Sequence, residues 1–231
     1  MKFIEFAGPP GGGKTQLAQL LHNHTRRIGL RSIHAETLSL ALQESGRFDL
    51  LGTFARSHPE VAKAIPELLG DVRSSKRKRL NQGMETWSAL QIQAHRIDLG
   101  FVDEGLLQRN AHLAHTGGTL DRYLEVVRQQ PVPDLIIYIT IDFQQGLERA
   151  ISRLPPERQA VRRRRLMPTL EVLPTIETAM RSALEIYRSR GVTVLELNGA
   201  SPQIRNLRRA WRCMQDCDLV AKTSPRPPSP T

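Results

Sequence analysis

Short runs of apolar residues alternate with amphipathic segments along most of the chain. Apolar and β-branched runs predict strands at residues 2–7, 31–35, 100–103, 135–141 and 192–197. The run at 135–141 is continuous, which is typical of a strand that is covered on both faces. Because helical patterns separate the strands, the sequence predicts an α/β fold with a five-stranded, mainly parallel sheet flanked by helices.

Amphipathic helices are predicted after most of these strands. The first begins near Lys14, shows apolar residues at helical spacing and ends at Gly29. Asp142 and Gln145 form a capping-box pattern at the start of another helix, which runs up to Arg153. The remaining helices are expected near residues 84–98, 120–129, 175–190 and 203–216.

Three segments depart from this alternation. Residues 37–98 are polar, mixed and mainly helical, and residues 154–168 are rich in arginine. The tail from Ser224 is rich in Pro and Ser, a composition that predicts disorder. Within the first of these segments, helix breaks are expected at Gly46, Gly52, Pro59, Pro66, Gly70 and Gly83.

The first strand leads into Gly8-Pro9-Pro10-Gly11-Gly12-Gly13-Lys14-Thr15, which fits the pattern G-x-x-x-x-G-K-[S/T]. Glycines let the backbone curl until several N–H groups face one anion, and the following helix adds its positive end. The Lys of this pattern reaches the β- and γ-phosphates, and the Thr hydroxyl binds Mg²⁺. We therefore expect a nucleoside triphosphate to be bound by Gly8, Gly11, Gly12, Gly13, Lys14 and Thr15.

Asp103 follows the third predicted strand, at the edge where ligands of open α/β sheets bind. A carboxylate at that edge can hold magnesium directly or through water, so Thr15 and Asp103 are the predicted metal residues. The alternative for Asp103 is a helix cap or a loop carboxylate. Glu104 either shares the metal role or faces a phosphate acceptor.

The chain has 33 Lys and Arg against 23 Asp and Glu, a formal net charge of +10. This charge points to anionic partners: nucleotides, phosphorylated substrates, nucleic acid or an acidic membrane face. Two basic runs, 76–79 and 162–165, either meet phosphates or form solvated faces. Because residues 154–168 contain no aromatic side chain on which bases would stack, nucleic acid is the less favoured partner.

Cys213 and Cys217 are the only cysteines, and they lack the paired spacing of a zinc site. They are interpreted as reduced thiols, which favours a cytoplasmic protein. No apolar run approaches the roughly 20 residues of a membrane span, and no signal peptide is recognised. The sequence therefore predicts a cytoplasmic location and no membrane partner.

Several segments together resemble the nucleoside monophosphate kinase group of P-loop kinases, especially thymidylate kinase-like proteins. The resemblance rests on the glycine-rich loop and on Phe101-Val102-Asp103-Glu104. It also rests on residues 133–139 followed by 146–153, and on the basic segment, long helix and final strand. It covers roughly two thirds of the chain in the order of the family, although only the glycine-rich loop is sharply specific.

Such kinases have a parallel five-stranded core, a small acceptor-binding lobe and a mobile lid. The resemblance implies a P-loop NTPase fold for residues 1–222, with the lobe at 37–98 and the lid at 154–168, and a tail at 223–231. It implies that Arg149 flanks the adenine base, that Arg153 approaches the transferring phosphate and that residues 198–201 border the base.

The resemblance leaves the acceptor open. Thymidylate kinases carry an Asp-Arg pair after the third strand, where this chain has Asp103-Glu104-Gly105. Related deoxynucleoside kinases place a carboxylate at the end of the second strand to take the proton of a hydroxyl acceptor, and Glu36 matches that position. A solvated strand-end glutamate is the alternative for Glu36.

Together these features predict ATP- and Mg²⁺-dependent phosphoryl transfer to a small molecule, most readily a nucleotide or nucleoside. Lys14, Asp103, Glu36 and Arg153 are the expected catalytic residues, and Arg149 and Arg153 are expected to contact ATP. One alternative is a polynucleotide 5′-kinase. The other is a regulatory nucleotide-binding P-loop protein without kinase activity. The sequence is also compatible with a homodimer.

Overall fold

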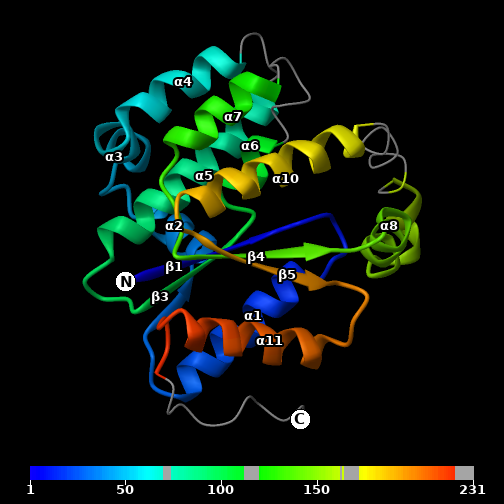
Figure 1. Ribbon diagram of the computed structural model, residues 1–231. Helices are drawn as coiled ribbons and strands as arrows, with labels where there is room; N and C mark the ends of the chain where they lie inside the picture. The colour runs from blue at the N-terminus through cyan, green and yellow to red at the C-terminus, as the bar shows by residue number, and fades with distance from the viewer. Residues whose placement is uncertain (70–73, 112–119, 162, 164–171, 222–231) are drawn as a thin grey trace.

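A computed structural model describes residues 1–69, 74–111, 120–161, 163 and 172–221 (Figure 1). Its centre is a sheet of five strands in the order β2-β3-β1-β4-β5, and every neighbouring pair is parallel. The strands are β1 (Lys2–Ala7), β2 (Ser32–His34), β3 (Leu99–Asp103), β4 (Leu135–Thr140) and β5 (Thr193–Asn198). The predicted α/β class and the five-stranded parallel sheet are confirmed.

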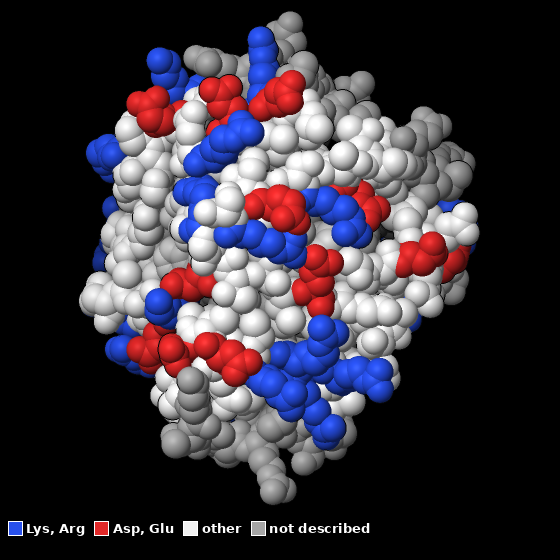
Figure 2. All heavy atoms as spheres, viewed as in Figure 1, with Lys and Arg blue, Asp and Glu red and all other residues white. Residues whose placement is uncertain are grey.

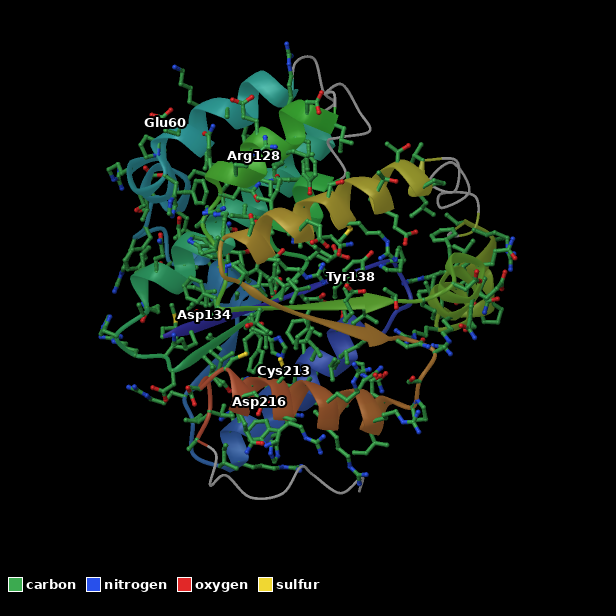
Figure 3. The ribbon with its side chains drawn as sticks, in the orientation of Figure 1. Glu60, Arg128, Asp134, Tyr138, Cys213 and Asp216 are labelled. Carbon is green, nitrogen blue, oxygen red and sulfur yellow. The ribbon has the colours of Figure 1, made fainter. Side chains whose placement is uncertain are left out.

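Helices cover both faces of the sheet. In Figure 1, α1 (Lys14–Arg27) and α11 (Gln203–Asp216) lie below it, and α10 (Leu173–Ser189) lies above it with α6 (Leu106–Ala111) and α7 (Leu120–Gln129). Side chains of β4 alternate between the two layers. Tyr138 joins the cluster under α10, whereas Ile137 and Ile139 join the cluster with α1 and α11, to which Cys213 also packs (Figure 3). The covered strand that the sequence predicts at 135–141 is therefore buried on both faces.

Residues 35–92 form four further helices: α2 (Ala35–Glu44), α3 (Leu50–Ser57), α4 (Pro59–Leu69) and α5 (Ser74–Ile92). Phe54, Leu80 and Trp87 form a separate core between them. The predicted breaks at Gly46 and Pro59 coincide with helix boundaries, and Gly70 lies outside the described residues.

Three of the predicted breaks are wrong, because Gly52, Pro66 and Gly83 lie inside helices. Gly52 is in the first turn of α3, where its N–H donates to the Asp49 cap and where any side chain would overlap that carboxylate. Gly83 lets α5 approach α6, since a Cβ there would lie 3.0 Å from Arg109 Cδ. At Gly52 and Gly83 the lack of a side chain permits close packing, and the helix continues through both residues.

Other boundaries differ slightly from the expectations. The second strand ends at His34 rather than residue 35, and the helix expected at 84–98 is the end of α5, which stops at Ile92. α8 (Phe143–Ser152) begins as predicted, because Asp142 Oδ1 accepts a hydrogen bond of 3.0 Å from Gln145 N. The tail from residue 222 lies outside the described residues.

Both cysteines are free thiols. Among the helices of the described residues, none combines the length and apolar character needed to cross a bilayer.

Glu5 is a carboxyl group in the middle of the core, only 1 % exposed. Its Oε1 accepts a hydrogen bond of 3.0 Å from the N–H of Leu107 in the first turn of α6. Burial raises the pKa of Glu5 from 4.5 to about 8. The side chain therefore joins β1 to α6 mainly as a neutral acid near neutral pH.

The raised pKa of Glu5 predicts a pH-dependent stability. Between pH 4.5 and 8 the folded chain keeps a proton that the unfolded chain has released, so the free energy of unfolding falls as pH rises through this window. Replacing Glu5 by Gln removes this titration, which contributes at most about 1.4 kcal/mol per pH unit. In urea unfolding at pH 5, 6.5 and 8, the free energy of unfolding of the wild type should fall with increasing pH relative to that of Glu5→Gln. If the difference in free energy of unfolding between the two proteins does not change with pH, the raised pKa of Glu5 is contradicted.

Candidate functional site

The glycine-rich loop connects β1 to α1 at the carboxyl edge of the sheet. Gly8, Gly11 and Gly13 all have positive φ angles, of 134°, 75° and 93°. Gly11 lies so close to α8 that any side chain would overlap the Gly146 carbonyl oxygen. Gly12 is buried, with its Cα facing the side chain of Ile139 on β4. The tight curl thus depends on glycine, as the motif predicts.

Lys14 is the first residue of α1, and its side chain is 6 % exposed. Its ammonium donates to the backbone carbonyls of Gly8 at 2.9 Å and Pro9 at 3.1 Å, and lies 3.9 Å from Glu104 Oε1. Burial lowers the pKa of Lys14, and the charges of Glu104 and Asp103 oppose that shift. A buried cation thus sits inside the loop, with neutral carbonyls as its nearest partners.

Thr15 and Asp103, the two predicted metal residues, meet at the mouth of this loop. The Thr15 hydroxyl donates to Asp103 Oδ2 in a short hydrogen bond. Burial raises the pKa of Asp103, and its other oxygen, Oδ1, is buried with no hydrogen-bond partner among the described residues.

Magnesium prefers oxygen ligands and is commonly held by one or two protein groups together with waters and phosphates. A hydroxyl beside a carboxylate with an unpaired oxygen fits that ion. Within the described part of the chain, no group of three or more His, Cys, Asp or Glu side chains is placed to hold a metal. Thr15 and Asp103 are the described residues at this edge whose oxygen atoms fit a magnesium ion.

Glu36 lies in the first turn of α2 rather than at a strand end, because β2 stops two residues earlier. Burial, with the charge of Asp103, raises the pKa of Glu36 to about 7. Its Oε1 is buried without a partner in the described structure. His34 also lies near Asp103, whose charge opposes the lowering of the His34 pKa by burial. Glu36 is therefore a half-buried carboxylate close to the predicted metal residues, not a solvated one.

The structure adds one residue to the candidate site, Gln108, which could not be identified from the sequence. Its side-chain amide accepts from Gly8 N at 2.8 Å and donates to Gly8 O at 2.9 Å. A glutamine five residues beyond a strand belongs to no short motif, and only the fold brings it to the loop.

The two arginines expected at the ATP site have different surroundings. Arg149 on α8 donates from Nη1 to Gly199 O at 2.7 Å, so it contacts the loop after β5 that was expected to border the base. Arg153 is the exposed C-cap of α8, and no hydrogen bond or ion pair joins it to the described loop residues. The structure thus places Arg149 beside residues 198–201 but does not bring Arg153 to Lys14.

The predicted lid is described only in part. Residues 156–161 and 163 are helical, and Arg163 forms a two-bond ion pair with Glu148 at 2.9 and 3.1 Å. The other arginines of the run 162–165 lie outside the described residues.

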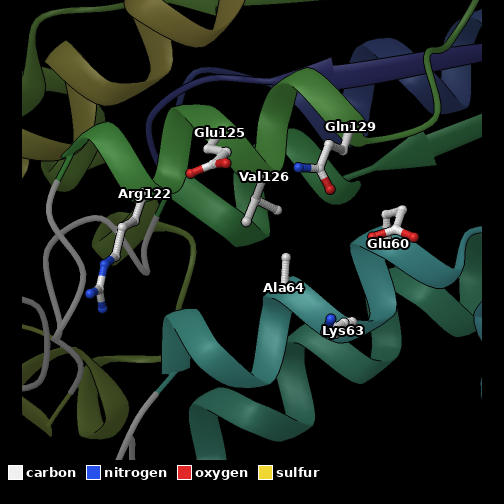
Figure 4. Close-up of a pocket in the computed structure, with 7 residues that line it drawn as sticks. All are labelled: Glu60, Lys63, Ala64, Arg122, Glu125, Val126 and Gln129. Carbon is white, nitrogen blue, oxygen red and sulfur yellow. The ribbon is translucent and has the colours of Figure 1, made fainter.

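Two of the cavities in the described part of the chain differ in their position relative to the loop. One of about 540 Å³ borders the loop, with walls that include Gly8, Pro9, Gln108, Tyr138 and Met180. The other, of about 390 Å³, lies between α4 and α7 (Figure 4). Its lining is mainly charged and polar, and it includes no residue of the glycine-rich loop. Of these two, the first borders the candidate site.

No protein-family model matches the chain, and a search of curated proteins finds none that matches it. The arrangement of the loop, Lys14, Thr15 and Asp103 is therefore the basis for assigning a function.

Proposed function

We propose that this protein is a P-loop kinase that transfers the γ-phosphoryl group of ATP to a small-molecule acceptor. One observation carries the proposal: the ammonium of Lys14 is buried inside a glycine-rich loop, beside the Thr15–Asp103 pair. A buried cation favours an anionic partner, and a loop before a helix N-terminus is suited to phosphates. The thymidylate kinase-like arrangement of the sequence supports the same function.

Each residue has a defined part in the proposed reaction. The loop N–H groups and the start of α1 bind phosphate oxygens, and Lys14 exchanges its bonds to Gly8 O and Pro9 O for charged β- and γ-oxygens. Magnesium, when bound by Thr15 and Asp103, neutralises charge on the phosphates. Arg149 stacks beside the base at residues 198–201, and Arg153 reaches the transferring phosphate if the lid closes over it.

The carboxylates near the loop support a hydroxyl rather than a phosphate as the attacking group. Glu36, Asp103 and Glu104 would repel a dianionic acceptor. Glu36 has an unpaired oxygen and a pKa of about 7, which suits a general base that takes a hydroxyl proton near neutral pH. A nucleoside is thus the acceptor that best combines the family resemblance with these charges.

An acceptor screen tests the proposal directly. Protein, Mg²⁺ and ATP labelled in the γ-phosphate are incubated with nucleotides, nucleosides, sugars or DNA ends. A kinase should transfer label to one of these classes and release little phosphate without an acceptor. Slow phosphate release that no acceptor changes would instead indicate the regulatory alternative.

Replacing Lys14 by Ala should weaken ATP binding by about 10- to 100-fold, the range of a lost charge-assisted hydrogen bond. The fold should remain, because the lost partners are loop carbonyls. Lys78→Ala removes the same charge from an exposed position on α5 and serves as the matched control. Unchanged affinity in a calorimetric titration of Lys14→Ala would exclude the phosphate-binding role of the loop.

Replacing Glu36 by Gln should lower turnover about 10²- to 10⁴-fold if the acceptor is a hydroxyl, because the variant removes a general base. Glu44→Gln, at the exposed end of the same helix, is the control and should leave turnover unchanged. A large loss with a proven phosphate acceptor would show that Glu36 has another role.

A polynucleotide 5′-kinase is the second candidate, and a feature of the surface favours it. Figure 2 shows a dense basic cluster over α11. Its members, spaced on one helical face, are the exposed side chains Arg205, Arg208, Arg209 and Arg212. Acidic side chains border the cluster, and the buried Trp211 offers no face for base stacking. We therefore expect weak, salt-sensitive contact with phosphates.

Polynucleotide binding should be weak and should vanish near physiological salt. For a duplex, the logarithm of the affinity plotted against the logarithm of the salt concentration should have a slope of about −0.9 per phosphate contact. Changing the four α11 arginines to Gln should flatten this salt dependence. A variant with Arg47, Arg56, Arg96 and Arg128 changed to Gln carries the same net charge and is the control. Submicromolar affinity for DNA at 150 mM salt, or phosphorylation of a 5′ end, would make the polynucleotide kinase the leading candidate.

A further inference from the structure

The inference concerns the peptide group of Gly8, where β1 stops and the loop begins. The last residue of β1 paired with β4 is Ala7, opposite Tyr138. Gly8 has a φ of 134°, and any side chain there would overlap the Ile139 carbonyl oxygen. Its N–H and C=O are buried beyond the sheet ladder, where backbone groups need partners from elsewhere.

Gln108 supplies both partners through one side chain. Its Oε1 accepts from Gly8 N at 2.8 Å, and its Nε2 donates to Gly8 O at 2.9 Å. Gly8 O also accepts from Lys14 Nζ at 2.9 Å. The amide thus fixes the orientation of the same carbonyl that holds the lysine, and only a group with adjacent donor and acceptor atoms can do this.

Gln108 is itself held firmly. It is 5 % exposed and lies in α6, whose first turn is fixed by the bond from Leu107 N to Glu5 Oε1. Gly105 permits this attachment, because a Cβ there would lie 2.5 Å from the Glu5 carboxyl carbon. Gln108 lies only five residues after Asp103, so a short segment connects the proposed metal carboxylate to the clamp that the Gln108 amide forms on Gly8.

We propose that Gln108 is a positioning residue that sets the Gly8 peptide, and through it the start of the phosphate loop, in the shape that binds a triphosphate. The consequence for ATP rests on the proposed function. The clamp itself does not, since it is a property of the protein without nucleotide.

The clamp is tested first without nucleotide, by hydrogen–deuterium exchange. Gln108→Met keeps the size of the side chain but removes both hydrogen bonds. Exchange of peptides covering residues 3–13 should become at least about tenfold faster, since a lost buried bond exposes the amide to local opening. Gln130→Met is the control: Gln130 is also buried, and accepts from Tyr187 Oη at 2.9 Å far from the loop. Loop exchange that is unchanged in folded Gln108→Met would overturn the proposal.

The effect on binding is tested with Gln108→Glu at several pH values. An ionised Glu accepts from Gly8 N but cannot donate to Gly8 O, whereas a protonated Glu does both. The ratio of wild-type to variant ATP affinity should be about tenfold or more at pH 8, and should approach one near pH 5. The titratable and charged groups around position 108, namely Glu5, Lys14, Asp103, Glu104 and Arg109, are present in both proteins, so the ratio cancels the pH effects that both proteins share.

A ratio that does not change with pH would contradict the positioning role. Absence of ATP binding by the wild type would refute the proposed function instead, while the exchange experiment would still decide whether the clamp exists.

Discussion

The buried ammonium of Lys14 is the interaction around which the carboxyl edge of the sheet is arranged. A charge that is 6 % exposed is costly unless polar groups surround it. The carbonyls of Gly8 and Pro9 provide those groups only because the loop curls back over the start of α1. That curl brings Gly8 against β4 and Gly11 against α8, where no side chain fits. The glycines, the sheet edge and the lysine therefore constrain one another.

The order of the strands explains why carboxylates gather at this loop. β1 lies between β3 and β4, and β2 lies beyond β3. Asp103 at the end of β3 thus reaches Thr15, and Glu36, just after β2, lies close to Asp103. Burial raises the pKa of both carboxyl groups. The site thus combines one buried ammonium group with carboxyl groups whose pKa values are raised. In the proposed function, the phosphates would pair with the ammonium group and the metal ion with the carboxyl groups.

Strongly periodic or apolar segments could be predicted from the sequence, as β1, α7 and α11 show, since local pattern determines them. The loop, Lys14, Thr15 and Asp103 could be predicted because one motif contains or adjoins them. The predicted breaks at Gly52 and Gly83 are wrong because these glycines contact Asp49 and Arg109, and only the packing of the fold reveals those contacts. Gln108 could not be found because its partner is 100 residues away in the chain. The roles of Arg153 and the lid remain predictions.

The central claim is that the loop recognises the β- and γ-phosphates through Lys14. Calorimetric titration with ATP, ADP and AMP in the presence of Mg²⁺ tests it most directly. The account predicts that ATP and ADP bind, and that AMP binds at least about tenfold more weakly, because AMP lacks the oxygens that Lys14 would reach. Equal affinity for all three nucleotides, or no binding of ATP, would contradict it.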